Sequence, residues 1–242
     1  MRTRARTGGR ALLLAHGQPS APAGPEAAMA RLAGAVAALL PGWQVRGATL
    51  AAPGALEAAL AAFGPAPVAV YPHFMTDGWF VATRIPERLA AAGRPDCPVL
   101  APFGRDPAAV GLCLRAALEG ARAHGLDPAA TTLLLAAHGS PSDPHPAEAT
   151  RAVAAALERS AAFRAIATGF VDEAPSIAEA ARRSGATLCL PFFAARNGHV
   201  LDDVPAELAD GGFAGALLAP VGEHPAAPRL IAAALRRAAV AP

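Results

Sequence analysis

The sequence predicts an α/β protein made of two tandem, doubly wound parallel-sheet halves that are related by internal duplication. Three observations predict this fold class. Four segments recur in the same order at a slowly drifting offset of 118–122 residues. Short apolar runs alternate with alanine-rich helical patterns along both copies. The apolar runs are continuous, as in parallel sheets that helices cover on both faces.

The duplication is visible in segments that share their residue types and their order along the chain. The matched pairs are residues 12–17 with 134–139, 52–58 with 174–180, 85–89 with 204–208, and 101–104 with 219–222. One such match could arise by chance in an alanine-rich chain, but four collinear matches indicate a duplication. We therefore divide the chain into an N-terminal half, residues 1–126, and a C-terminal half, residues 127–242.

Each half is expected to contain strands that alternate with helices. In the first half, strands are predicted at residues 12–15, 45–50, 68–71 and 99–101, and helices at 26–40, 56–63, 86–92 and 108–123. In the second half, strands are predicted at residues 133–137, 165–170, 187–190 and 216–219. The expected arrangement is flavodoxin-like, with ligands bound at the carboxyl ends of the strands.

Composition excludes several classes of function. The net charge is only +2, and no basic run interleaved with aromatic residues is present, so we expect no nucleic-acid partner. The longest apolar stretch, residues 33–40, is far below the ~20 residues of a membrane span, so we expect no membrane partner. Cys97, Cys113 and Cys189 are isolated from one another, which fits a reduced compartment and predicts a cytoplasmic protein.

The histidines of the second half mark a candidate site. His138 directly follows the first predicted strand of this half, and His199 follows the third. Glu173 stands at the end of the second strand. Loops after the first and third strands flank one crevice in a doubly wound sheet, so the two histidines are expected to converge there, and Glu173 completes a His/Glu/His set. Imidazole and carboxylate ligands suit a divalent first-row metal such as cobalt, nickel or iron.

The first half lacks most of this set. His16 is retained there, but Ala51 and Phe80 stand at the positions of the glutamate and of the second histidine. The site of this half is therefore predicted to be degenerate. Two alternatives stay open: His16 could be a hydrogen-bonded structural residue, or it could form the working site together with His73, which follows the third predicted strand.

Other polar residues near the strand ends are expected to cap helices. Ser142, Asp143 and His145 stand where the first helix of the second half begins. Asp106 and His224 occupy equivalent positions ahead of the last helix of each half.

At these motifs the chain resembles the class II tetrapyrrole chelatases, in particular the CbiX/SirB group of sirohydrochlorin cobalto- and ferrochelatases in their long, duplicated form. The segments that carry the likeness are residues 133–140, Glu173 with 175–180, and 191–193 continuing to 198–200 and 203–205. The likeness spans nearly the whole chain and is most specific in the second half.

The resemblance implies a lyase that inserts cobalt, iron or nickel into a sirohydrochlorin-type tetrapyrrole in cobalamin or sirohaem biosynthesis. It implies that His138, His199 and Glu173 form the catalytic and metal-binding set. The expected contacts to the carboxylates of the macrocycle are Gly139, Ser140, Arg196, Arg84 and His16.

The metal is expected to be a substrate, with no permanently bound cofactor. The tetrapyrrole is the expected partner, and the protein is expected to be a monomer or a homodimer.

Two other functions could use these residues. A non-catalytic tetrapyrrole- or metal-binding homologue is distinguished from the enzyme only by the His/Glu/His set. A hydrolase or phosphotransferase with His16 or His138 as nucleophile is disfavoured. Histidine phosphatases need an arginine before His-Gly, where this chain has Ala15 and Ala137, and no G-x-S-x-G elbow or P-loop is present.

Overall fold

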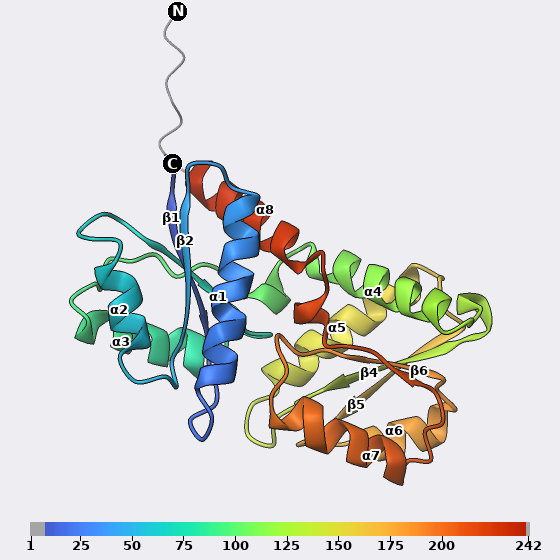
Figure 1. The fold of residues 1–242 in the computed structure, drawn as a ribbon. Coiled ribbons are helices and arrows are strands. Elements are labelled where there is room, and N and C mark those ends of the chain that lie inside the picture. The colour runs from blue at the N-terminus through green and yellow to red at the C-terminus, as the bar shows by residue number, and fades with distance from the viewer. Residues whose placement is uncertain (1–7, 241–242) are drawn as a thin grey trace, which may run out of the picture. The chain divides into compact units, whose positions relative to one another are not determined.

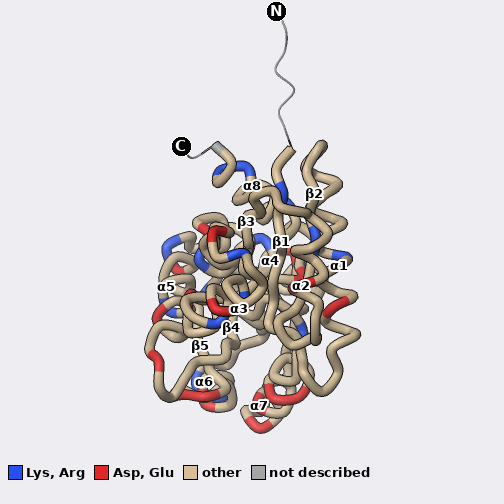
Figure 2. The backbone as a smooth tube through the Cα atoms, turned by 90° about the vertical axis from the view of Figure 1, so that its left-hand side faces the viewer, with Lys and Arg blue, Asp and Glu red and all other residues tan. Residues whose placement is uncertain are grey.

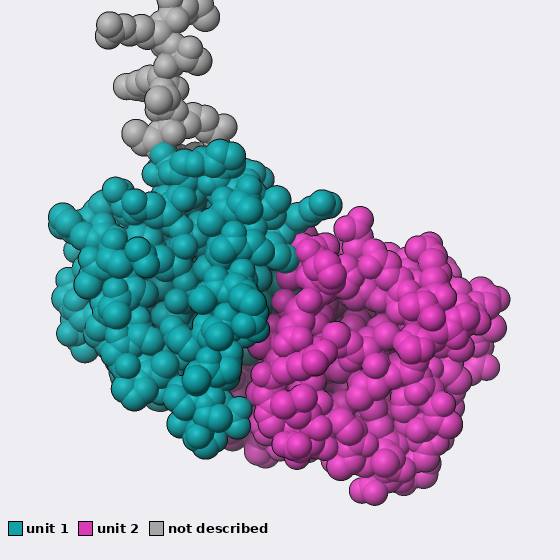
Figure 3. Space-filling view, in the orientation of Figure 1, with its two compact units in different colours: residues 1–106, 228–242 teal, residues 107–227 magenta. Residues whose placement is uncertain are grey.

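The computed structural model describes residues 8–240, so the outermost residues of both predicted halves, 1–7 and 241–242, lie outside the described part. The chain forms two compact units (Figure 3). Unit 1 comprises the residues up to Asp106 together with those from Pro228 onward, and unit 2 comprises Pro107–Ala227.

Unit 1 is a three-stranded parallel sheet with the order β2-β1-β3. Its strands are β1 (Arg10–Ala15), β2 (Gln44–Thr49) and β3 (Ala69–Pro72). Its helices are α1 (Ala23–Ala38), α2 (Ala55–Ala61), the π-helix η1 (Phe80–Arg84), α3 (Ile85–Ala91), the short 3-10 turn η2 (Phe103–Arg105) and α8 (Ala227–Val240). Helices α1 and α8 lie on one face of the sheet, and α2 and α3 lie on the other (Figure 1).

Unit 2 is a four-stranded parallel sheet with the order β5-β4-β6-β7. Its strands are β4 (Thr132–Ala137), β5 (Ala165–Phe170), β6 (Leu188–Pro191) and β7 (Ala216–Leu217). Its helices are α4 (Ala109–Ala123), η3 (Pro128–Ala130), α5 (His145–Arg159), α6 (Ile177–Ser184), the π-helix η4 (His199–Asp203), α7 (Val204–Asp210) and η5 (Val221–Glu223). Helices α4 and α5 cover one face of the sheet, and α6 and α7 cover the other (Figure 1). The predicted doubly wound α/β fold, with its flavodoxin-like strand order, is confirmed.

The fourth predicted strand of each half is shorter than expected. In unit 1 the prediction of a strand at residues 99–101 is wrong, because only a single bridge joins Val70 to Val99. In unit 2, β7 has two residues. Prolines bound these segments in the sequence, at Pro98, Pro102 and Pro220, and a proline cannot donate a backbone hydrogen bond to a ladder.

A π-helical turn precedes a proline-containing helix in both units, and the sequence pattern did not predict it. Pro86 and Pro205 stand at the second residue of α3 and α7, directly after η1 and η4. Proline removes one i→i−4 hydrogen bond and its ring crowds the carbonyl four residues earlier. The wider π turn accommodates both effects, and such turns are frequent at functional sites.

The central strand of each sheet, β1 or β4, is buried in the core of its unit. All six residues of β4 are buried, as are the last five of β1. The three cysteines are free and buried, and burial raises the pKa of the Cys113 thiol to about 12. Within residues 8–240, none of the helices has the length and apolar character needed to cross a membrane.

Each compact unit contains the last helix of the other sequence repeat. Helix α4 of the first repeat packs against β6 and α5 in unit 2. Helix α8 of the second repeat belongs to unit 1 for nearly all its length, where the Arg236 guanidinium donates to the carbonyl of Leu39. The boundary at residues 126/127 therefore describes the duplication in the sequence, whereas the compact units exchange their terminal helices.

Ion pairs at equivalent positions hold these exchanged helices. In unit 1 the Arg237 guanidinium on α8 donates to the buried carboxylate of Asp106. In unit 2, His224 Nε2 lies 3.1 Å from the carboxylate of Glu119 on α4. The other ring nitrogen, Nδ1, accepts the backbone N–H of Ala226, which fits the expected capping role of His224.

Replacing Asp106 with asparagine should destabilise the protein. The amide removes a buried negative charge that accepts from Arg237, and hydrogen bonds to charged groups contribute about 1.5–3 kcal/mol. We expect the free energy of unfolding in guanidinium titrations to fall by that amount. As a control, Arg115→Gln alters an exposed pair on α4 and should change stability by less than about 0.5 kcal/mol. Equal stability of Asp106→Asn and the wild type would contradict this assignment.

Candidate active site

The loop after β4 carries the first predicted histidine. His138 directly follows the strand, and Gly139 has a φ of 72°, in the left-handed region that favours glycine. A Cβ atom on this glycine would lie 2.7 Å from Cγ of Glu173 and 3.0 Å from Cβ of Phe170. The glycine therefore allows the loop to approach the end of β5 closely.

The π-helix η4 carries the second histidine. Its first turn is held by Asn197, whose side-chain oxygen accepts the backbone N–H of Val200 at 3.1 Å. Nδ1 of His199 lies 2.6 Å from Oδ2 of Asp203, four residues later. The imidazole is thus oriented by a carboxylate on the same turn.

The two predicted histidines converge. Their Nε2 atoms are 3.1 Å apart, and their rings meet at an interplanar angle of 77°. Nδ1 of His138 lies 3.0 Å from the carbonyl of Gly139 and 3.2 Å from Oδ2 of Asp172. Both histidines therefore face hydrogen-bond acceptors through Nδ1 and each other through Nε2.

This geometry determines what the pair can do. Because acceptors surround both Nδ1 atoms, the proton of each neutral ring belongs on Nδ1, and both Nε2 atoms present lone pairs. Two lone pairs that point at each other need a proton or a cation between them. With metal–nitrogen bonds of about 2.1 Å, two nitrogens on one ion are separated by about 3.0 Å at 90° and about 3.4 Å at the tetrahedral angle. The observed separation suits both uses.

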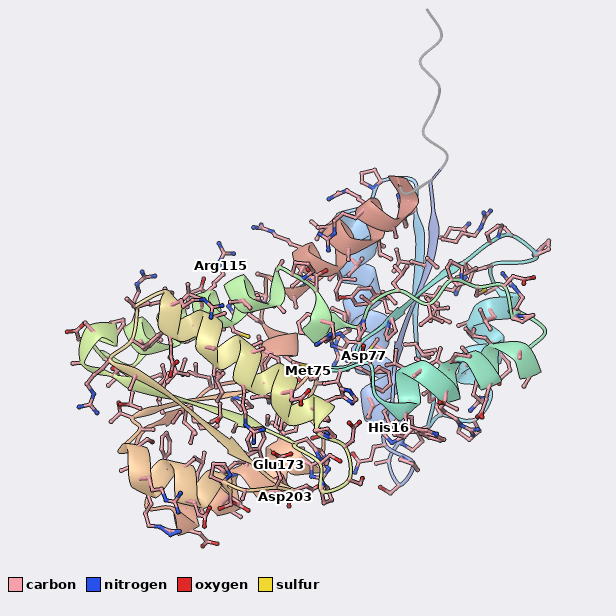
Figure 4. The ribbon with its side chains drawn as sticks, turned by 180° about the vertical axis from the view of Figure 1, so that it is seen from behind. His16, Met75, Asp77, Arg115, Glu173 and Asp203 are labelled. Atoms are coloured by element: carbon pink, nitrogen blue, oxygen red, sulfur yellow. The ribbon has the colours of Figure 1, made fainter. Side chains whose placement is uncertain are left out.

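Glu173, the third predicted ligand, instead braces the loop. Its Oε2 accepts the backbone N–H of Ser140 at 3.0 Å, and its Oε1 accepts from Arg151 at 2.9 Å. Glu173 and Asp203 are labelled in Figure 4. Among residues 8–240, no group of three or more His, Cys, Asp and Glu side chains is arranged to hold a metal ion. The structure brings the two histidines together and gives the glutamate other partners.

Sequence reasoning missed the two carboxylates that orient the rings. Asp172 was overlooked because Glu173, its neighbour at the end of β5, was preferred as a ligand. Asp203 carried a usable signal, since it lies four residues after His199 on a helical segment. Acidic residues continue along α7, as Figure 2 shows.

Three of the predicted substrate contacts belong to unit 2. Gly139 and Ser140 share the loop of His138, where Ser140 Oγ accepts the backbone N–H of Asp143 at 3.1 Å. The exposed Arg196 is paired with Glu223, which also accepts the backbone N–H of Arg196. A substrate carboxylate would compete with Glu223 for this guanidinium.

The other two predicted contacts, His16 and Arg84, belong to unit 1. The ring centroids of His16 and Phe80 are 4.4 Å apart, and burial lowers the pKa of this histidine. This pair repeats the 4.3 Å contact of the two unit 2 histidines, with phenylalanine in place of the second imidazole. Arg84 forms an exposed ion pair with Glu87 at 3.4 Å. The predicted equivalence of His199 and Phe80 is thereby reproduced in space.

The alternative site in the first half receives less support. His73 is buried and meets the ring of Phe103 edge-on at 5.0 Å, whereas His16 lies against Phe80. The imidazole pair with facing Nε2 atoms, His138 and His199, lies in unit 2.

Comparisons with known proteins show the family of the chain. The sequence profile of the CbiX family matches residues 132–238. A solved structure described as CbiX, the terminal enzyme for biosynthesis of siroheme in denitrifying bacteria, is 44% identical, with a TM-score of 0.86. The match covers 95% of this chain and 99% of that chain. A search of curated proteins gave no match.

Two more distant structures share the fold. SirB from Bacillus subtilis with Fe3+ is 18% identical, with a TM-score of 0.76 and 96% of each chain covered. The sirohydrochlorin chelatase SirB from Bacillus subtilis subspecies spizizenii, in complex with cobalt, is 20% identical, with a TM-score of 0.68 and coverage of 95% of this chain and 94% of that one. The resemblance inferred from the sequence motifs is confirmed, and the chain belongs to the CbiX family.

Proposed function

We propose that this protein is a metal chelatase that inserts a divalent ion into a sirohydrochlorin-type tetrapyrrole. The observation that carries the proposal is the pair of facing Nε2 atoms, 3.1 Å apart, each on a ring whose Nδ1 meets a carboxylate. The similar CbiX structure is described as the terminal enzyme of siroheme biosynthesis, and the similar SirB structures hold iron or cobalt.

The reaction requires two exchanges. The macrocycle loses two pyrrole N–H protons, and the hydrated ion loses water ligands as four ring nitrogens replace them. A neutral imidazole can bind the ion or accept a proton near neutral pH. We assign metal binding and proton acceptance to His138 and His199 together, without dividing the two roles between them.

The surrounding carboxylates support this pair. Asp203 accepts the Nδ1 proton of His199, and the carbonyl of Gly139 accepts that of His138, with Asp172 3.2 Å away. Outer partners of this kind commonly orient metal-binding histidines. For Glu173, proposed from the sequence as a ligand or proton relay, the contacts to Ser140 and Arg151 favour a supporting role.

Recognition of the substrate is assigned to groups that bind carboxylates. In unit 2 these are the backbone N–H of Gly139, the hydroxyl of Ser140 and the guanidinium of Arg196, whereas the backbone N–H of Ser140 already donates to Glu173. The two unit 1 residues expected from the sequence as contacts, His16 and Arg84, are not assigned to this carboxylate-binding set.

The metal acts as a substrate and not as a resident cofactor. Imidazole ligands accept cobalt, iron and nickel, so cellular supply decides which ion is used. A cytoplasmic location and a monomeric or homodimeric state remain predictions.

Removing either imidazole should abolish insertion. For His138→Ala and His199→Ala we expect the rate to fall by at least about 100-fold, because each variant loses a ligand or a base. The measurement is the absorption change of sirohydrochlorin incubated with Co2+, Fe2+ or Ni2+. His145→Ala is the control, because this exposed histidine pairs only with Asp143 among its described contacts and should insert metal normally. A non-catalytic binding protein would show no insertion with any of the three ions, even as the wild type.

Asp203→Asn should slow insertion by about 10- to 100-fold, since the amide can present its N–H to Nδ1 and reverse the tautomer of His199. Thermal unfolding should be nearly unchanged, because the carboxylate is half exposed. Asp210→Asn, at the exposed end of α7, is the matched control. An Asp203→Asn enzyme with wild-type kcat would show that this carboxylate does not orient the ring.

The two roles of Glu173 can be separated by a pair of variants. Glutamine keeps an oxygen that can accept the N–H of Ser140, whereas alanine keeps none. If the residue braces the loop, Glu173→Gln should retain insertion within about tenfold of the wild type, and Glu173→Ala should lose more. Equal and severe losses in both variants would instead indicate proton transfer through the carboxylate.

A further inference from the structure

The degenerate site of unit 1 keeps the framework of the unit 2 site. Both units place a His-Gly turn directly after the central strand, β1 or β4. Both also place a π-helix in the connection that follows β3 or β6. The two glycines lie close to equivalent residues. A Cβ atom on Gly17 would lie 3.1 Å from Cβ of Ala51, and one on Gly139 would lie 2.7 Å from Cγ of Glu173. Unit 1 therefore retains the same backbone with different side chains.

The charge at this framework is reversed between the units. Residues 199–210 of unit 2 contain four acidic residues and no arginine, whereas the equivalent residues 80–91 contain two arginines and one glutamate. Arg84 stands at the position of Asp203, and Leu50 at that of Asp172. The unit 1 surface has thus lost the groups that attract a cation and gained one that attracts an anion.

Aromatic side chains take the place of the lost polar groups. Trp79 is 59% exposed and meets the ring of Phe80 edge-on at 5.1 Å. Phe80 contacts His16 at 4.4 Å and stacks with Phe74 at 6.2 Å and an interplanar angle of 25°. His16 is labelled in Figure 4, with Met75 and Asp77 of the loop after β3. An exposed tryptophan supported by a phenylalanine is a rigid apolar surface. Covering it with a flat ring removes apolar area from water and therefore favours binding.

The neighbouring charges leave the arginine available. Arg84 pairs with Glu87 at 3.4 Å, and Arg105 pairs with Asp77 at 3.8 Å, and in both pairs the two side chains are at least 43% exposed. Exposed pairs of this kind contribute little, so a ligand carboxylate can replace the glutamate.

We propose that His16, Phe74, Trp79, Phe80 and Arg84 form a second ligand site, the aromatic site, which binds the flat face and one peripheral carboxylate of the metal-free tetrapyrrole. Trp79 and Phe80 contact the ring, and Arg84 pairs with the carboxylate. The site holds no metal and performs no chemistry. The identity of the ligand rests on the proposed function, whereas the preference for a flat aromatic anion rests on the side chains alone.

The test uses metal-free sirohydrochlorin and the full chain. Trp79→Ala should raise the Kd for the tetrapyrrole about tenfold or more, by analogy with the loss of a stacking aromatic ring, and Arg84→Gln should raise it several-fold. In insertion assays Trp79→Ala should raise KM and leave kcat within about twofold. The matched control is Trp43→Phe, which changes the other tryptophan, at the opposite end of the unit 1 strands.

The same control reports binding directly. In Trp43→Phe protein, Trp79 is the only tryptophan, so a ligand on the aromatic site should quench its emission saturably, with the Kd found by absorption. Unchanged Kd and KM in both Trp79→Ala and Arg84→Gln, with insertion still dependent on His138, would overturn the aromatic site and leave the chelatase function intact. Trp79-dependent binding without insertion by the wild type would support the aromatic site and overturn the proposed function.

Discussion

The parallel pairing of β4 with β6 is the constraint on which the unit 2 site depends. Their register runs from Leu133 opposite Leu188 to Ala136 opposite Pro191, and the carbonyl of Ala136 accepts the N–H of Phe192 at 2.7 Å. Since both strands run in the same direction, their carboxyl ends emerge at one edge of the sheet. The histidine after β4 and the π-helix after β6 therefore meet, although 61 residues separate the two rings along the chain.

Orientation of the rings comes from local contacts that add little to stability. The histidine–carboxylate pairs in this site are partly exposed, and pairs of that kind contribute modestly to folding. Their effect is to keep each Nδ1 occupied as a donor, which leaves the Nε2 lone pairs for a proton or an ion. The loop itself is held more firmly, by Glu173 on the backbone of Ser140 and by the close approach at Gly139.

The two copies of one framework carry different side chains at their strand ends, and each compact unit includes the last helix of the other repeat. The pairs Asp106–Arg237 and His224–Glu119 hold these exchanged helices at equivalent positions. In unit 1 the exchanged helix supplies the basic partner, Arg237, whereas in unit 2 it supplies the acidic partner, Glu119, so the two helices are not interchangeable. Unit 2 kept the acidic π-helix beside two imidazoles, whereas unit 1 replaced the second imidazole with Phe80 and the carboxylate with Arg84.

The sequence by itself determined the duplication, the strand and helix order, and the convergence of His138 with His199, because apolar periodicity and parallel topology require only local patterns and chain direction. It did not determine the two π-helices or the single bridge at Val99, because a proline in the sequence shows that a helix or ladder is perturbed but not what replaces it. It also did not determine the exchange of α4 and α8, which depends on packing against distant partners. The sequence also could not separate Glu173 from Asp172, since adjacent residues at a strand end point in different directions. Only the packed loop decides which carboxylate lies beside a ring nitrogen and which accepts from the backbone.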